Sequence, residues 1–167
     1  ISKIATYDKE LALNLAKSKI RVEAPIPGTR AVGVEVENEK QGSVGLHELL
    51  QSPEWNKMIV DKPLSFALGK DISGKAVVGN LAKMPHLLIA GTTGSGKSVM
   101  TNTLLSSMLY HNSPADLRLI IVDPKQVEMA AYEDIPHLLT PIITDVTKSL
   151  SALKWAVNEM ERRYSIM

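Results

Sequence analysis

The sequence predicts an α/β fold, with a parallel-sheet core in residues 63–167 that follows a small α+β domain in residues 1–62. Short apolar runs at 85–90 and 117–122 indicate buried strands, and a helix-spaced pattern lies between them. Strands that alternate with helices are typical of a parallel sheet. The helical pattern before Pro63 then gives way to an alternating one, which places the domain boundary there.

The composition excludes several classes of protein. The chain has 167 residues, a net charge of +1 and no cysteine. Without cysteine there is neither a disulfide framework nor a thiolate metal site, which fits a reducing compartment. The near-neutral charge gives no general attraction to nucleic acid. No apolar run approaches the length of a membrane span, and the first residues lack a signal-peptide pattern. We therefore expect a cytoplasmic segment that makes no membrane contact of its own.

The first domain is predicted to contain two helices and two strands. An amphipathic helix is expected over the first twenty residues. Alternating residues at 20–24 and 32–36 indicate two strands, joined by a loop rich in proline and glycine. A short helix is predicted between Leu46 and Leu50, ending before Ser52 and Pro53. The apolar face of the first helix is formed by Ile4, Tyr7, Leu11 and Leu15.

The second domain is predicted to begin with a hairpin. Apolar residues alternate at 64–68, a turn follows, and the chain returns at 75–78. Three further strands are expected at 85–90, at 117–122 and, shorter than these, at 141–144.

Two helices are predicted in this second domain. The first begins near Lys97 and ends before Pro114, and the second has Asp145 as its expected N-cap. Each helix carries apolar residues at the spacing of one helical face. These are Met100, Leu104, Leu105, Met108 and Leu109 in the first helix, and Leu150, Leu153, Val157, Met160 and Tyr164 in the second.

The run from Gly91 to Ser98 prescribes a specific chemistry. It fits the phosphate-binding pattern of glycine, four arbitrary residues and Gly-Lys-Ser, and a predicted strand and helix flank it as the motif requires. Its glycines allow several N–H groups to converge on one anion, and the helix adds the positive end of its dipole. Lys97 is the expected catalytic cation at the β and γ phosphates of ATP, and Ser98 is the expected Mg²⁺ ligand. The predicted nucleotide-binding residues are Gly91, Thr92, Thr93, Gly94, Ser95, Gly96, Lys97, Ser98 and Val99.

Asp123 has two interpretations from spacing alone. It follows a predicted buried strand, where a Walker B aspartate could hold Mg²⁺ through water, but it could equally position a loop. Glu128, Glu133 and Asp134 follow closely and could include a base for water, although carboxylates in a surface loop are usually solvated. The four histidines lack ligand spacing, so a zinc site is not expected.

Two other groups of residues are expected to have ordinary roles. Lys148, Lys154, Arg162 and Arg163 put positive charge along the last helix, but glutamates interrupt it. A solvated face is therefore favoured over a DNA contact. The tryptophans, Trp55 and Trp155, are expected to be packing residues.

Four blocks in the same order closely resemble the FtsK/SpoIIIE family of bacterial DNA translocases. They are the stretch around the glycine loop at 84–98, Asp-Pro-Lys at 123–125, Ile-Pro-His-Leu-Leu-Thr at 135–140 and Glu-Met-Glu-Arg-Arg-Tyr at 159–164. The resemblance implies part of the family's α domain, followed by the start of its RecA-like P-loop NTPase domain. It also implies an ATP-driven hexamer that moves double-stranded DNA during chromosome segregation, at division or sporulation, in a parent protein anchored in the membrane.

The resemblance changes the interpretation of Asp123. In this family the Walker B strand ends in a separate Asp-Glu pair further along, and no such pair follows an apolar run here. We therefore expect Asp123 to support the nucleotide site, and the chain to be a fragment with an incomplete core that binds nucleotide without turning it over efficiently. Two alternatives are a self-contained P-loop kinase, for which we find neither an arginine-rich lid nor an acceptor site, and a secretion-system pump built on the same ATPase core.

Overall fold

The computed structural model describes residues 7–17, 20–40 and 42–167, which form two compact units, Ile1–Ser43 and Val44–Met167. The division falls earlier than the expected boundary after residue 62. The reason is that two helices, α3 (Leu46–Leu50) and α4 (Pro53–Ile59), pack against the hairpin that follows them.

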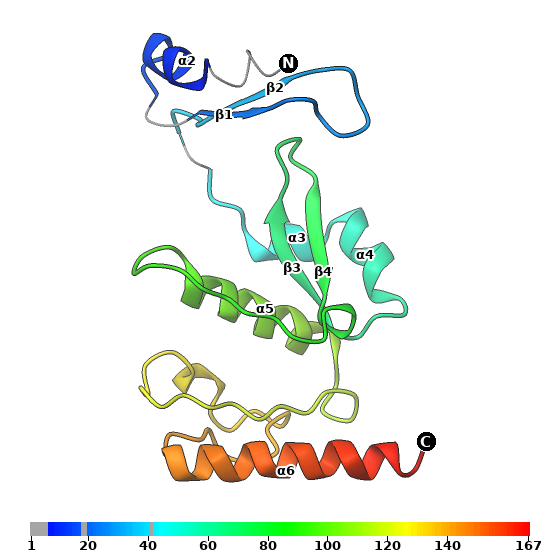
Figure 1. Cartoon of the computed structure of the whole chain (residues 1–167). Helices are drawn as coiled ribbons and strands as arrows, with labels where there is room; N and C mark the ends of the chain where they lie inside the picture. Colours follow the sequence, from blue (N-terminus) through cyan, green and yellow to red (C-terminus); the bar gives the residue numbers. More distant parts are fainter. Residues whose placement is uncertain (1–6, 18–19, 41) are drawn as a thin grey trace. The chain divides into compact units, whose positions relative to one another are not determined.

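The described residues of the first unit form helix α2 and one hairpin (Figure 1). Helix α2 (Asp8–Asn14) is shorter than the helix expected over the first twenty residues. Ile4, on its predicted apolar face, lies outside the described residues. Strands β1 (Ile20–Glu23) and β2 (Gly33–Val36) pair antiparallel, which confirms the two predicted strands.

The second unit begins with the two helices and then the predicted hairpin, formed by β3 (Ser65–Lys70) and β4 (Ala76–Asn80). Helix α4 was not expected, because Ser52-Pro53 suggests a helix end. Instead Ser52 is its N-cap and accepts a hydrogen bond from the N–H of Trp55 at 3.2 Å, while proline at the first helical position has no N–H to satisfy. Trp55 is 2% exposed, which confirms its packing role.

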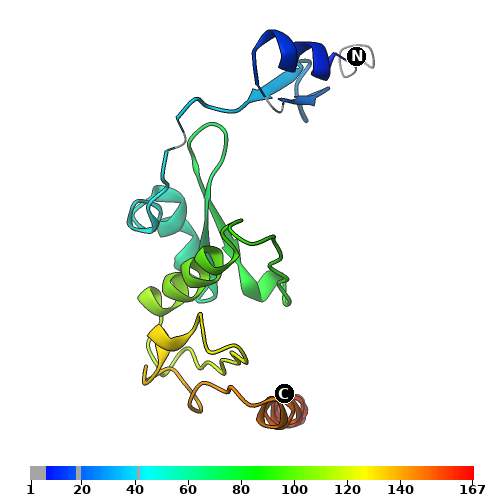
Figure 2. The ribbon, with the colours of Figure 1, turned by 90° about the vertical axis from the view of Figure 1, so that its left-hand side faces the viewer.

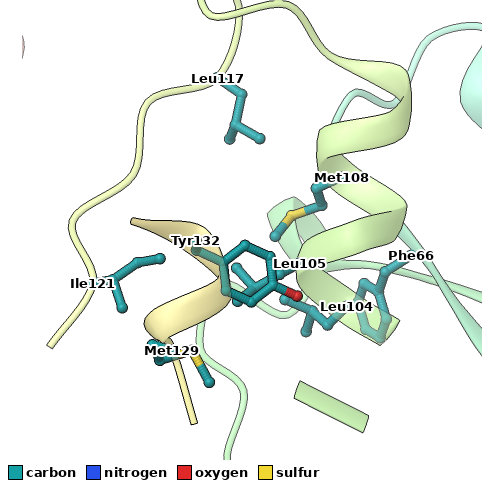
Figure 3. Packing of buried hydrophobic residues seen from close by; sticks show 8 residues of the cluster. All are labelled: Phe66, Leu104, Leu105, Met108, Leu117, Ile121, Met129 and Tyr132. Atoms are coloured by element: carbon teal, nitrogen blue, oxygen red, sulfur yellow. The ribbon is translucent and has the colours of Figure 1, made fainter. Parts of the chain in front are cut away.

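The core packs Phe66 of the hairpin and one face of helix α5 (Lys97–His111) with side chains of the segment 117–132. Helix α5 confirms the first predicted helix of the second domain. Figure 3 shows the eight buried residues that form the core: Phe66, Leu104, Leu105, Met108, Leu117, Ile121, Met129 and Tyr132. A buried hydroxyl also joins the hairpin to α5, since Ser107 accepts a hydrogen bond from the N–H of Ala67 at 3.2 Å. The second half of α5 is therefore anchored to a packed scaffold.

The predicted parallel pairing is present only in reduced form. Of two isolated parallel bridges, Val122↔Ile143 joins the segments expected to form strands at 117–122 and 141–144. The other, Leu119↔Leu138, joins the first of these segments to a residue that precedes the second. The predicted strand at 85–90 is wrong: its backbone is irregular and Leu88 is 89% exposed. A strand needs a neighbour for its N–H and C=O groups, and no described segment pairs with this one. The described residues thus form a mixed structure of helices and two small antiparallel sheets.

Helix α6 (Val146–Tyr164) confirms the predicted final helix, which Figure 1 shows lengthwise as a straight element and Figure 2 shows end on. Asp145 is its N-cap and accepts a hydrogen bond from the N–H of Lys148 at 2.9 Å, as predicted. Trp155 is 48% exposed, so its predicted packing role is wrong in this structure. Near the end of α6, the hydrogen bonds from Arg162 and Arg163 lower the pKa of Glu159 to about 2. This paired carboxylate partly neutralises both arginines.

Candidate nucleotide-binding site

The glycine loop has the backbone geometry that its sequence predicts. Gly94 and Gly96 have φ values of 79° and 93°, in the left-handed region that side chains disfavour. A turn closes the loop, since the N–H of Ser95 donates to the carbonyl of Thr92 at 3.1 Å. A Cβ atom on Gly91 would lie 2.1 Å from the Ser95 hydroxyl oxygen. The loop therefore depends on glycine at these positions.

Helix α5 begins directly after this loop, with Gly96 as its N-cap. No described side chain caps this end, and the first turn carries no acidic residue. The N–H groups of the first turn and the helix dipole are thus available to an anion. Val99, in the same turn, is 69% exposed.

The loop and the start of α5 surround a hollow of about 440 Å³, within the range of ligand sites. Every loop residue of the predicted site lines it except Ser95. Two residues from a later segment, Lys125 and Glu128, complete its wall. The full lining is Gly91, Thr92, Thr93, Gly94, Gly96, Lys97, Ser98, Val99, Lys125 and Glu128.

A larger hollow, of about 590 Å³, lies along α6, but its lining is mainly apolar. It includes Trp155, Met160 and Tyr164, with Arg118 and Glu159 among its few charged groups. It contains neither a glycine loop nor the start of a helix, the two features that favour phosphate binding. Chemistry rather than size therefore identifies the smaller hollow as the candidate site.

Glu128 makes the closest polar contact within the site. The Ser98 hydroxyl donates a hydrogen bond to its Oε1 at 2.7 Å, and the Lys97 ammonium lies 3.9 Å from the same oxygen. The interpretation of Glu128 as a solvated carboxylate is thus wrong, whereas Glu133 and Asp134 are exposed as expected. Spacing did not reveal this contact, because the chain from 123 to 128 folds back in a way that no periodic pattern encodes.

Asp123 stabilises the turn of the chain between residues 123 and 128 through hydrogen bonds to the backbone. It is 8% exposed, and its Oδ2 accepts hydrogen bonds from the backbone N–H groups of Val127, Glu128 and Met129, each at 3.1 Å. Burial raises the pKa of Asp123, but these backbone donors, led by Met129, lower it more, so the pKa lies below the ordinary value. The geometry supports the loop-positioning role for Asp123.

Asp123→Asn is expected to loosen the loop at 127–129, because a neutral oxygen accepts weaker hydrogen bonds than a carboxylate. The amide hydrogens of these residues should exchange faster than in the wild type, as measured by NMR. In the wild type, protection of these amide hydrogens against exchange should be complete above the unfolded carboxyl pKa of about 3.9. It should decline as the pH falls through the lower pKa of folded Asp123. The variant should lack this decline, and the exposed Asp134→Asn should match the wild type. Wild-type exchange rates in Asp123→Asn would contradict the role.

The residues of the hollow fit a triphosphate and Mg²⁺. The uncapped N–H groups at the start of α5 and Lys97 suit phosphate oxygens, while the oxygens of Ser98 and Glu128 suit a hard cation. Neither here nor elsewhere in the described ranges do three or more histidine, aspartate or glutamate side chains form a group that could hold a metal ion by themselves.

Two family models together match almost the whole chain. The FtsK/SpoIIIE family model matches residues 45–167, and the FtsK alpha domain model matches residues 1–38. The chain belongs to the FtsK/SpoIIIE family. This confirms the resemblance seen in the four sequence blocks, and the loop at 91–98 lies within the larger match.

Curated relatives of this FtsK/SpoIIIE chain are named DNA translocase FtsK. The protein from Clostridium tetani is 55% identical over 99% of the chain, and that from Pseudomonas putida is 50% identical over 100%. The chain spans only 22% and 20% of these relatives' lengths.

A solved structure supports the fold of this FtsK/SpoIIIE chain. The pCW3 conjugation coupling protein TcpA, solved as a monomer with ATPγS, matches with a TM-score of 0.53 and 23% identity. The match covers 99% of this chain and 43% of TcpA. Together with the family match, it confirms the predicted P-loop α/β fold class. None of the described helices is both long and apolar enough to cross a bilayer.

Proposed function

We propose that this FtsK/SpoIIIE chain is the ATP- and Mg²⁺-binding segment of a hexameric double-stranded DNA translocase that acts in chromosome segregation, at division or sporulation. The observation that carries the proposal is the hollow formed by the glycine loop and the start of α5, which Lys97 and Ser98 both line. Membership of the family supports DNA as the substrate on which the motor acts. The segment itself is proposed to be cytoplasmic and its parent to be anchored in the membrane.

Each residue of the site has a proposed role in phosphoryl transfer. The backbone N–H groups between Gly91 and Val99 hold the phosphate oxygens in place, which is most of what such a reaction requires of a protein. Lys97 stabilises negative charge on the β and γ phosphates. The Ser98 hydroxyl binds Mg²⁺, which when present neutralises charge that develops on the phosphate oxygens. Asp123 supports the site by holding the loop that carries Lys125 and Glu128.

The DNA contact is proposed to lie outside α6. The two arginines near its end, Arg162 and Arg163, already bind Glu159, at 2.7 and 2.8 Å. The Glu159 carboxylate offsets part of their positive charge, which favours the solvated-face interpretation of α6. Contact between the full-length motor and the DNA backbone should still be electrostatic and therefore salt-dependent.

The test is ATP turnover by the full-length parent with and without linear double-stranded DNA. We expect DNA to stimulate turnover, and the stimulation to fall as salt is raised. A matched amount of single-stranded DNA serves as the control and should stimulate less. Turnover that is indifferent to DNA, combined with phosphate transfer to a small acceptor molecule, would favour the kinase alternative and contradict the proposal.

A further inference from the structure

We propose that Glu128 supplies a carboxylate to the metal site, near Mg²⁺ and beside Ser98, either directly or through one bound water and in addition to any Walker B aspartate further along. This inference rests on the proposed function, because it concerns the metal that accompanies the nucleotide. It assigns a role to a residue that sequence patterns place in an ordinary surface loop.

The first argument is distance. The Ser98 hydroxyl oxygen and Glu128 Oε1 are 2.7 Å apart. Neighbouring ligands of an octahedral Mg²⁺, each at 2.0–2.1 Å, are about 2.9 Å apart. The two oxygens therefore already have nearly the separation that one shared ion requires. If a water lay between Glu128 and the metal, Ser98 could bind the metal and still donate its proton to the Glu128 carboxylate. Carboxylates commonly accept hydrogen bonds from metal ligands in this way.

The second argument is that the other nearby carboxylate is already engaged. Asp123 is buried and its Oδ2 accepts three backbone hydrogen bonds. Moving it to a metal would leave those N–H groups without their acceptor, at a cost in free energy. Glu128 is more accessible, with a side chain that is 36% exposed.

The third argument is that Glu128 is held in place. Its own backbone N–H is one of the three that donate to Asp123, at 3.1 Å. The side chain thus starts from a fixed point opposite Ser98, which favours a preorganised ligand over a mobile surface group. Asp123 therefore positions the loop, and Glu128 faces the metal.

A competing explanation is that Glu128 only occupies the phosphate site when no nucleotide is bound. Its oxygen lies 3.9 Å from the Lys97 ammonium, where a phosphate oxygen would otherwise be attracted. Under that explanation, removal of its charge should strengthen nucleotide binding whether or not metal is present. A metal ligand makes the opposite prediction when metal is present, so the two are separable.

The test compares ATPγS binding to the full-length protein in Mg²⁺ and in EDTA, measured by calorimetry. Wild-type protein should bind more tightly in Mg²⁺. Glu128→Gln should lose roughly tenfold or more of this metal-dependent gain, while its affinity in EDTA stays equal or rises. Ser98→Ala should lose a similar gain, and the double variant should lose little more than either, because both residues would serve one ion. The exposed Glu133→Gln should match the wild type.

Two results would overturn the inference while leaving nucleotide binding intact. One is an undiminished metal-dependent gain in Glu128→Gln. The other is an equal increase in affinity in both conditions, which would make Glu128 a competing anion only. Wild-type protein that binds ATPγS in neither condition would instead overturn the proposed function, and the inference with it.

Discussion

Lys97→Ala is expected to abolish ATP turnover by the full-length parent and to weaken nucleotide binding by roughly 10- to 100-fold. Charge-assisted hydrogen bonds of this kind contribute about 1.5–3 kcal/mol, and each 1.36 kcal/mol is a factor of ten. Turnover should fall further than affinity, because Lys97 also stabilises charge that grows during phosphoryl transfer. Steady-state ATPase rates and calorimetric binding of ATPγS measure the two effects separately.

A matched control for that variant is Lys148→Ala, on the first turn of α6 and outside the lining of the nucleotide hollow. It removes one positive charge outside the site and should leave the ATPase rate and the affinity for ATPγS unchanged. Circular dichroism should show that both variants fold. Wild-type turnover in Lys97→Ala would remove the glycine loop from the mechanism.

Phe66→Ala is expected to destabilise the second unit by about 3–5 kcal/mol, the usual cost of deleting a fully buried phenylalanine. Phe66 is 0% exposed and belongs to the cluster that joins the hairpin to α5. The cavity would open over Gly79, which lies opposite Phe66 in the ladder and has no side chain to fill it. Denaturant unfolding measures the loss as a shift in midpoint.

Leu68→Ala provides the comparison for this prediction. Leu68 lies on the same strand but is 45% exposed. Its replacement should cost well under half as much, since less apolar area leaves water when the protein folds. Equal losses in the two variants would contradict the placement of Phe66 in the core.

The elements that the sequence predicts correctly depend on short-range signals. Helix α5 follows from its apolar spacing and the glycine loop, and the N-cap of α6 follows from Asp145. The hairpin of β3 and β4 needs only neighbouring residues to pair. The candidate site is similar, because its loop residues are consecutive and their backbone geometry is set by glycine.

The predictions that fail depend on partners distant in the chain. An apolar run becomes a strand only if another strand is beside it, and 85–90 has none among the described residues. Burial of Trp155 likewise depends on what covers α6. Glu128 was missed because its place opposite Ser98 is set by the hydrogen bonds of Asp123, which belong to tertiary structure. At Ser52 the signal was local but ambiguous, since a Ser-Pro pair both ends one helix and caps the next.

A crystal structure of the full-length protein with ATPγS and Mg²⁺ is the most direct test of the central claim that the hollow at the start of α5 binds the phosphate chain. We predict phosphate oxygens within hydrogen-bonding distance of the loop N–H groups and of Lys97 Nζ. The metal should lie at Ser98. A nucleotide bound elsewhere, with Glu128 still accepting the Ser98 hydrogen bond in an otherwise closed hollow, would contradict the account.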